Sequence, residues 1–258
     1  MTDNLISIHE LKKYWSSPFQ LALDIPNLHI RTAEKIAILG PSGSGKTTFL
    51  KTISKDLKIN EGCIYFLNQS LEDWSVVDLS HHRAILPQSN EISFDLSVSL
   101  IVSLGRVSRS CQSETEYIVF QCLDLCKASH LLDRSYHQLS GGEKARVQMA
   151  KVFAQLWDVH GGALLVDEPF AAFDPFLQIF LLKSLSQFVT LRSLTVIAIL
   201  HDVNHAMQFF DRGLLIKDGK LFIDTPISEI QKKSLEDLYE NSFLEFKTIN
   251  AERYFIAK

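Results

Sequence analysis

The sequence predicts an α/β fold with a mixed central sheet whose innermost strands are parallel. Residues 163–166 and 194–200 are continuous apolar runs, which are typical of strands buried on both faces, and a helical pattern over residues 175–190 separates them. A third apolar run, residues 35–39, leads into a glycine-rich loop and a helix-forming stretch. Strand, helix and strand in this order predict right-handed parallel connections.

Shorter strand patterns occupy both ends of the chain. Those in the N-terminal half are residues 5–9, 21–30, 62–66 and 83–86. A hairpin is expected over residues 212–223, because both positions of Asp218-Gly219 at its turn accept a positive φ. Beyond Pro226 we expect one or two short helices and then a strand pair around Phe246 and Phe255.

The middle of the chain has a different pattern. Between about residues 93 and 157 apolar residues recur at helical spacing, and no strand-like alternation persists. We therefore expect a single domain over residues 1–258. Its core would comprise about residues 1–92 and 158–258, including a C-terminal extension, and about residues 93–157 would form an inserted helical subdomain.

The loop after residues 35–39 matches the phosphate-binding pattern G-x-x-x-x-G-K-[ST] at every fixed position. Its glycines let backbone N–H groups turn toward phosphate oxygens, and the next helix adds its positive N-terminal end. Lys46 is expected to reach the β- and γ-phosphates, and the Thr47 hydroxyl to ligate Mg²⁺. The expected nucleotide-contacting residues of the loop are Gly40, Pro41, Ser42, Gly43, Ser44, Gly45, Lys46, Thr47 and Thr48. A chemically inert loop fits poorly, because Lys46 directly follows the last glycine.

Two carboxylates, Asp167 and Glu168, directly follow the apolar run at residues 163–166. Ligands of open α/β sheets bind where strands end. We expect Asp167 to hold Mg²⁺, directly or through water, and Glu168 to polarise the water that attacks the γ-phosphate. For an isolated pair of acids a solvated loop or a helix cap is the commoner outcome, but the phosphate loop upstream favours the catalytic interpretation.

Ser140, Gly141 and Gly142 open a helical pattern that continues through Ala150. Such a helix start can bind an anion through its N–H groups and its dipole. It can equally be an ordinary helix cap, with Ser140 as the N-cap and Glu143 completing a capping box. The two interpretations are compatible.

The composition excludes several classes of protein. The chain has 258 residues, of which 46% are hydrophobic, which favours a large core over disorder; its net charge is −4, and no run of Lys and Arg suggests a nucleic acid partner. No apolar run approaches the ~20 residues of a membrane-spanning helix. The N-terminus lacks the pattern of a secretory signal, so we expect a cytosolic chain with reduced thiols. The cysteines are Cys63, Cys111, Cys122 and Cys126.

Two other patterns have the spacing of metal ligands. His201 and His205 are four residues apart, but His201 closes an expected strand, so the two rings would not share a helix face. Cys122, Cys126 and His130 are also spaced by four, yet no fourth ligand is apparent, and a packed helix face is the favoured interpretation.

Taken together, these segments resemble the nucleotide-binding subunits of ABC transporters, over nearly the whole chain. Leu139-Ser140-Gly141-Gly142-Glu143 resembles the family's signature sequence, and Leu86-Pro87-Gln88 resembles the loop whose glutamine meets Mg²⁺ and the attacking water. Phe173-Asp174 resembles the D-loop, and His201 resembles the switch histidine that contacts the γ-phosphate. The implied fold is a P-loop NTPase of the ABC type, with a mixed central sheet, an N-terminal antiparallel β subdomain and an inserted helical subdomain.

Three positions depart from the family's usual residues. Glu143 stands where most members have Gln, Phe170 where Thr or Ser is usual, and Phe173 where Leu is usual. None of these changes removes a catalytic group. Phe173 is expected to alter how the D-loop packs at the dimer interface.

The resemblance implies an ATPase that uses ATP and Mg²⁺ and works as a homodimer. ATP would lie between residues 40–48 of one copy and Ser140, Gly141 and Gly142 of the other, with Asp174 also assigned to the nucleotide site. The implied catalytic residues are Lys46, Gln88, Glu168 and His201, and the implied Mg²⁺ ligands are Thr47, Gln88 and Asp167.

An aromatic side chain near the N-terminus of this family usually stacks on adenine. Tyr14 is the candidate here, by its position before the second strand. Trp15 and Phe19 are alternatives, and any of the three could belong to the core instead.

The resemblance also implies partners and a location. The homodimer would bind a dimer of integral-membrane permease subunits at the cytoplasmic face of the bacterial inner membrane, and a periplasmic substrate-binding protein would act indirectly. Residues 93–98 occupy the place where the family receives a helix from its membrane partner. Phe94 and Leu96 would either form that docking surface or be buried in the core of the helical insertion.

Several stretches resemble the ATPases of bacterial haemin importers, within the wider iron-chelate and cobalamin import group. They are Asp73-Trp74, residues 82–88, Phe94, Leu104-Gly105-Arg106, residues 139–157 and residues 201–206. The implied function is to power uptake of haemin or a related iron complex; an importer for siderophore or cobalamin, or an exporter, is the alternative. The chain is too short between its phosphate and signature loops for the coiled coil of DNA-repair ABC ATPases, and it has one cassette where translation-type ABC factors have two.

Overall fold

The structure is a computed structural model, and it describes residues 4–16, 19–88, 94–107, 112–168, 173–248 and 253–258. The chain forms two compact units. Unit 1 comprises Met1–Trp74 and Thr195–Lys258, and unit 2 comprises Ser75–Leu194.

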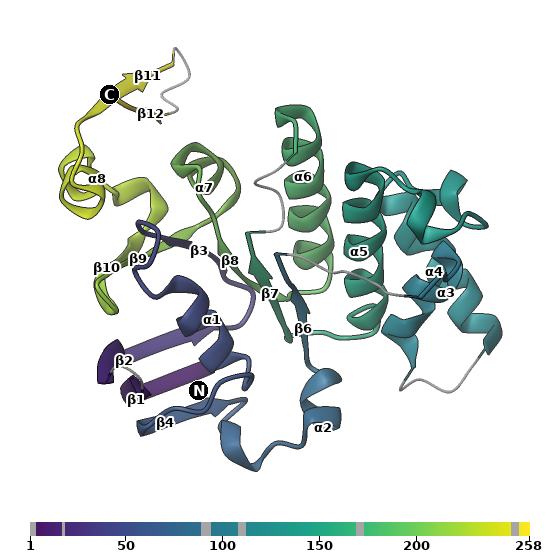
Figure 1. The fold of residues 1–258 in the computed structure, drawn as a ribbon, viewed down its shortest axis with the longest axis horizontal. Helices are drawn as coiled ribbons and strands as arrows, with labels where there is room; N and C mark the ends of the chain where they lie inside the picture. Colours follow the sequence, from purple (N-terminus) through teal and green to yellow (C-terminus); the bar gives the residue numbers. More distant parts are fainter. Residues whose placement is uncertain (1–3, 17–18, 89–93, 108–111, 169–172, 249–252) are drawn as a thin grey trace. The chain divides into compact units, whose positions relative to one another are not determined.

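A mixed sheet forms the centre of unit 1 (Figure 1). Its strands lie in the order β5-β4-β1-β2-β10-β9-β3-β8. They are β1 (Asn4–Ser16), β2 (Phe19–Arg31), β3 (Lys35–Leu39), β4 (Glu61–Phe66), β5 (Gln69–Ser70), β8 (Thr195–Ile199), β9 (Arg212–Lys217) and β10 (Lys220–Pro226). β1 pairs antiparallel with both β2 and β4, whereas β3 pairs parallel with both β8 and β9. An antiparallel portion and a parallel portion therefore share one sheet.

The described part of unit 1 also contains three α-helices and a small hairpin. The helices are α1 (Lys46–Ile53), α7 (Val203–Phe209) and α8 (Lys232–Tyr239), and the hairpin consists of β11 (Phe243–Lys247) and β12 (Arg253–Ala257). Figure 1 shows α8 and the hairpin in yellow at the C-terminal end of the unit. β11 and β12 pair only with each other, as a separate two-stranded sheet.

Unit 2 is mainly helical. Its elements are α2 (Val76–Ser80), β6 (Arg83–Leu86), α3 (Val98–Ser103), α4 (Gln112–Leu125), α5 (Gly141–Gln155), β7 (Ala163–Asp167) and α6 (Pro175–Leu191). α5 packs against α3, α4 and α6, as Figure 1 shows. The rings of Phe153 on α5 and Phe188 on α6 stack with centroids 4.0 Å apart, and the Arg192 guanidinium lies 4.4 Å from the Phe188 centroid. This aromatic contact fixes the helices beside the parallel pair β6 and β7.

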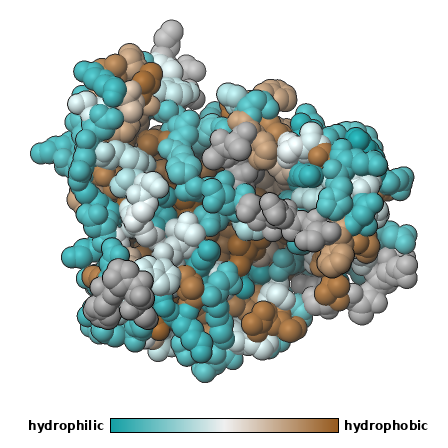
Figure 2. All heavy atoms as spheres, viewed as in Figure 1, coloured by the Kyte–Doolittle hydropathy of each residue, from teal (hydrophilic) through white to brown (hydrophobic). Residues whose placement is uncertain are grey.

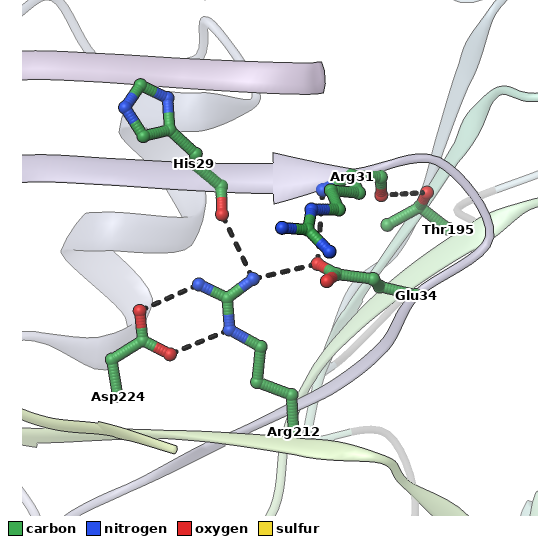
Figure 3. Close-up of polar contacts among 6 residues, drawn as sticks. All are labelled: His29, Arg31, Glu34, Thr195, Arg212 and Asp224. Carbon is green, nitrogen blue, oxygen red and sulfur yellow. Dashed lines mark hydrogen bonds and ion pairs between the residues drawn. The ribbon is translucent and has the colours of Figure 1, made fainter. Parts of the chain in front are cut away.

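An ion-pair network around Arg212 joins β9, β10 and the turn before β3 in unit 1 (Figure 3). The Arg212 guanidinium donates to both oxygens of Asp224, at 2.7 Å each, to Glu34 at 2.8 Å and to the backbone carbonyl of His29 at 3.0 Å. The hydrogen bonds to Asp224 are the main reason that the pKa of Arg212 is raised above its ordinary value. Arg212 pairs with Ile36 in register, so the network holds the beginning of the strand whose other end carries the phosphate loop.

Most of the predicted elements are confirmed, and the differences have local causes. β1 extends to Ser16, well beyond the predicted residues 5–9. Its register with β4 shifts between His9 and Lys12, where Glu10 has a positive φ of 49°. The resulting bulge interrupts the alternation that would mark a longer strand. The short helix α7 was not predicted. In the described part of residues 93–157 we find helices and no strand beyond an isolated bridge between Ser97 and Ser135, whereas the domain boundaries proposed from sequence stay a prediction.

The surface carries scattered apolar side chains among polar ones. Figure 2 shows brown patches separated by broad teal areas on the face that it presents. Among the large hydrophobic residues that the structure describes, the most exposed are Val107 at 81% and Phe94 and Phe176 at 74% each. Among the described helices, none combines the length and the apolar content that crossing a bilayer would require.

Candidate functional site

The phosphate loop lies at the end of a fully buried strand in unit 1. Residues 36–39 of β3 are 0% exposed, and the loop leads from Gly40 to α1, which begins at Lys46. A Cβ at Gly40 would lie 2.2 Å from the backbone oxygen of Ile216, so the neighbouring strand leaves no room for a side chain. Gly45, the N-cap of α1, has a φ of 103°, which L-residues rarely adopt. Steric and conformational demands therefore explain both glycines.

Lys46 is held inside this loop. Its side-chain ammonium donates hydrogen bonds to the carbonyl oxygens of Gly40 and Pro41, both at 2.9 Å, and the residue is only 5% exposed. A buried ammonium is tolerated when carbonyls take its hydrogens. No side chain caps the N-terminus of α1. The loop thus brings a cation and the positive end of a helix to one place, as a phosphate site requires.

The other predicted loop residues differ in exposure. Ser42, Gly43 and Thr47 are exposed, whereas Ser44 is buried. The Ser44 hydroxyl has no hydrogen-bond partner in the structure, although its backbone carbonyl accepts from Gly219 at 2.9 Å. Thr48 is half-buried in the first turn of α1.

His201 lies at the same edge of the sheet as the phosphate loop. β8 and β3 are parallel, Ile199 pairs with Ile38, and the Leu200 N–H donates to the Ile38 carbonyl at 3.2 Å. Parallel strands end at a common edge, so the chain after β8 and the chain after β3 leave the sheet side by side. His201 is exposed there. The structure thus brings two predicted γ-phosphate contacts together within unit 1.

The candidate adenine-stacking residues lie at the end of β1 and the start of β2. Tyr14 and Trp15 directly precede Ser16, the last residue of β1, and Tyr14 donates its N–H to Asn60 at 2.9 Å. Trp15 is 40% exposed, with the Lys13 ammonium 5.3 Å from its ring centroid. Phe19 begins β2, and its side chain lies outside the described part of the structure. The choice among them stays a prediction.

In unit 2 the predicted glutamine and both carboxylates meet at one strand edge. β6 and β7 are parallel and Leu86 pairs with Val166. Asp167 is the last residue of β7, Glu168 follows it, and Gln88 lies two residues beyond the end of β6, at the same edge of the sheet. Asp167 is 8% exposed, whereas Gln88 is exposed. Glu168 has a φ of 46°, in the left-handed region that a residue with a Cβ occupies only at a cost in energy. Strained conformations of this kind are common at active sites.

The signature loop forms the start of α5. The Glu143 N–H donates to the Ser140 hydroxyl at 3.3 Å, and the Ser140 N–H donates to the Glu143 carboxylate at 2.8 Å, which completes the predicted capping box. The hydrogen bond from the Ser140 backbone is the main reason that the pKa of Glu143 lies below its ordinary value. A Cβ on Gly142 would come within 2.8 Å of Leu177 Cδ2, whereas one on Gly141 would make only an ordinary contact with Phe173 at 3.7 Å.

The D-loop residue Asp174 has a structural role that sequence reasoning missed. Its carboxylate accepts from the Leu177 N–H at 3.0 Å as the N-cap of α6, and Pro175 occupies the first turn. Asp followed by Pro before a helical run is the signal that could have identified it. Phe170 lies outside the described residues.

The described residues contain no group of three or more His, Cys, Asp or Glu side chains placed to hold a metal ion. Cys122 and Cys126 are buried on and beside α4, and burial raises the pKa of both thiols well above their ordinary value. Protonated, buried thiols are poor metal ligands, which agrees with the packed helix face proposed for them.

Comparisons with known proteins agree with this geometry. The family model described as ABC transporter matches residues 23–171. The hemin import ATP-binding protein HmuV of Pseudomonas aeruginosa is 38% identical over 215 residues, covering 82% of this chain and 84% of that protein.

Solved structures share the fold. A chain from an inward-facing ABC transporter has a TM-score of 0.82 at 21% identity, covering 99% of this chain and 98% of its own. A bacterial ABC transporter cassette, solved as a dimer, has a TM-score of 0.76 at 26% identity, covering 86% of this chain and 98% of its own. The chain therefore belongs to the ABC transporter family, and it is an ATPase.

Proposed function

We propose that this chain is the ATP-hydrolysing subunit of a bacterial importer that takes up haemin or a related iron complex. The observation that carries the catalytic part is the buried Lys46 ammonium inside a glycine loop at the end of β3. The cargo rests on the 38% identity to a hemin import ATP-binding protein and on the stretches that resemble haemin importers. An importer for siderophore or cobalamin, or an exporter, is the alternative.

Lys46 and the backbone N–H groups of the phosphate loop would bind the β- and γ-phosphates of ATP. Gly40, Ser42, Gly43 and Gly45 shape the loop, and the uncapped start of α1 adds its dipole. We assign adenine stacking to Tyr14. On binding, the Lys46 ammonium would exchange its hydrogen bonds to the Gly40 and Pro41 carbonyls for the phosphate oxygens.

The donor set suits Mg²⁺, because Thr47, Gln88 and Asp167 offer only oxygen ligands and Asp167 is a buried carboxylate at a strand end. When bound, the ion would neutralise charge on the phosphates. Thr47 would supply its hydroxyl, Asp167 its carboxylate and Gln88 its side-chain carbonyl.

Hydrolysis is a phosphoryl transfer to water, which depends chiefly on positioning and charge stabilisation. Glu168 would accept a proton from the attacking water, and Gln88 would orient that water. Lys46 and His201 would stabilise the negative charge that develops on the γ-phosphate. The left-handed backbone at Glu168 would aim its carboxylate away from the direction that β7 follows.

A second copy of the chain would complete the site. Ser140, Gly141 and Gly142 of one copy would contact the ATP held by the other, with Asp174 nearby. A similar cassette solved as a dimer supports this arrangement. The core of residues 1–92 and 158–258 would thus bind one side of the nucleotide, and the helical subdomain of residues 93–157 the other.

The dimer would act at the cytoplasmic face of the inner membrane, on a dimer of permease subunits, with a periplasmic binding protein delivering cargo. Phe94 is 74% exposed, and Val98, the first residue of α3, is 0% exposed. An exposed phenylalanine anchored by a buried neighbour supports the docking role for residues 93–98 over burial in the helical core.

Two variants test the hydrolytic mechanism. Lys46→Ala should weaken ATP binding at least ~100-fold, because it removes the charge that holds the phosphates. Glu168→Gln should bind ATP with nearly unchanged affinity yet turn over about 10²–10³-fold more slowly, since it loses only the proton acceptor. Fluorescent-nucleotide titration measures the first and phosphate release the second. Near-normal turnover in Glu168→Gln would refute the assigned base.

A separate measurement tests the cargo. The chain would be co-expressed with its permease, reconstituted in lipid vesicles, and assayed for ATP-driven haemin accumulation. Uptake of a siderophore or of cobalamin instead, or release of cargo in the opposite direction, would select one of the alternatives.

A further inference from the structure

The side chain of Asn204 binds the backbone of the C-terminal strand β12. Its amide Nδ2 donates to the Phe255 carbonyl at 3.0 Å, and its Oδ1 accepts from the Phe255 N–H at 2.8 Å. Both backbone groups of one residue are therefore satisfied by one side chain that lies 51 positions away in sequence. An ionised carboxylate lacks the donor and an alkyl group lacks both donor and acceptor, so neither reproduces this pair of hydrogen bonds.

Asn204 is tightly linked to His201. It lies in the first turn of α7, and its N–H donates to the Asp202 carboxylate at 2.7 Å, so that Asp202 caps the helix. Val203, between them, is 6% exposed. A capped and buried helix start leaves little freedom between Asn204 and the exposed His201.

The strand that receives Asn204 is itself anchored. Phe255 is 3% exposed, and the Arg253 guanidinium lies 5.1 Å from its ring centroid. Arg253 also donates to Glu245 on β11 at 2.8 Å and to the Ser228 carbonyl at 2.9 Å. Hydrogen bonds to β11 and to the Ser228 carbonyl therefore hold β12 in place.

The same C-terminal segment packs near the strand that leads into the phosphate loop. α8 contacts β9, the neighbour of β3, and burial raises the pKa of Tyr239, the last residue of α8, to about 12. β12 contacts α7, which follows His201. The described part of the C-terminal segment therefore packs on one element next to β3 and on the helix that follows His201.

We propose that Asn204 is a positioning residue for ATP hydrolysis, acting through His201 by fixing α7 to β12. The inference rests on the proposed function, because it requires that His201 contact the γ-phosphate. In this arrangement the C-terminal segment determines where the histidine stands, without touching nucleotide itself. Loss of the Asn204 hydrogen bonds lets the first turn of α7 shift, and His201 then loses its alignment.

The experiment compares kcat and KM for ATP in the full-length protein carrying Asn204→Ala, alone and combined with His201→Ala. Misalignment of a group that acts in the transition state should lower kcat about tenfold and leave KM within about twofold. In the His201→Ala background the same change should lower kcat by less than about twofold, because the residue through which it acts is already gone. Asn204→Asp, which keeps the acceptor for the Phe255 N–H, should fall between Asn204→Ala and the unaltered chain.

Asn241→Ala is the matched control. Asn241 lies in the same C-terminal segment. Among the described residues, its side-chain oxygen accepts a hydrogen bond from the adjacent Ser242 N–H at 2.8 Å and makes no bond to β12. It should leave kcat unchanged. Hydrogen exchange at the Phe255 amide should accelerate in Asn204→Ala and not in Asn241→Ala, which shows that the contact has opened while the protein stays folded.

The outcomes separate the two proposals. An equal fall in kcat from Asn204→Ala in both backgrounds, or an opened Phe255 amide with unchanged kcat, overturns the positioning role and leaves the hydrolytic mechanism intact. Normal turnover in His201→Ala alone overturns the role given to the histidine and the positioning role with it.

Discussion

Two helices of this protein, α1 and α5, have glycine at or next to their first residue, yet they differ in how their first N–H groups are capped. α1 starts from Gly45, which provides no side-chain cap, whereas α5 starts from Ser140 within a complete capping box. The Glu143 carboxylate already supplies negative charge at the start of α5. We infer that the start of α1 can bind an anion by itself. The start of α5 would have little affinity for a free anion and would contact only the phosphates of an ATP that a second copy of the chain already holds.

The largest expected effect comes from crowding the first of these loops. In Gly40→Ala the new Cβ would lie 2.2 Å from the Ile216 backbone oxygen, so the loop or β9 must shift. We expect the free energy of unfolding to fall by about 1–3 kcal/mol and ATP affinity to fall at least ~10-fold. Urea denaturation and nucleotide titration measure the two quantities.

Gly161→Ala is the control for that substitution. Gly161 has a φ of 69° and no atom within 4 Å of the new Cβ, so it isolates backbone strain from crowding. We expect a loss of about 1 kcal/mol and no change in ATP affinity. Equal effects at the two glycines would show that the contact with Ile216 does not matter.

The next prediction compares the free energy of unfolding after replacement of a serine near the start of each helix. Ser140→Ala removes the N-cap of α5 and should lower the free energy of unfolding by about 1 kcal/mol. Ser44→Ala removes a buried hydroxyl that has no hydrogen-bond partner, so nucleotide-free protein should be equally stable or slightly more stable. Urea denaturation without nucleotide distinguishes them. Similar losses from both substitutions would contradict the contrast between the two helices.

The smallest effect depends on pH. The pKa of Glu143 is lowered in the folded protein, first by the Ser140 backbone hydrogen bond, so its stabilising contribution is present above the unfolded value near 4.5 and is lost as the pH falls through the folded value. Glu143→Gln should therefore be less stable at pH 7, by about 0.5 kcal/mol, and equal to the unaltered chain at pH 3. A difference that persisted at pH 3 would assign the effect to packing instead of charge.

The two helix starts also show what could be predicted from sequence. The loop between β3 and α1 and the capping box of α5 were predicted correctly, because each depends on residues within a few positions and local backbone geometry leaves few alternatives. Continuous apolar runs also predicted β3 and β8 as strands, whereas their pairing as neighbours was not predicted. These features need no knowledge of distant contacts.

Distant contacts account for what was missed. The bond between Asn204 and Phe255 joins positions far apart in the chain, and nothing in the residues around Asn204 indicates a partner strand. The bulge at Glu10 concealed the full length of β1, because a single extra residue exchanges the inward and outward faces.

The left-handed backbone at Glu168 sets stability against catalysis at a single position. Protein engineering for thermal tolerance often begins by replacing residues of positive φ with glycine, and by that criterion Glu168 would be among the first choices. The substitution would relieve strain and could yield a sturdier protein. That protein would have lost the carboxylate that we propose as the catalytic base, so selection by melting temperature alone would favour a variant that this proposal expects to be inactive.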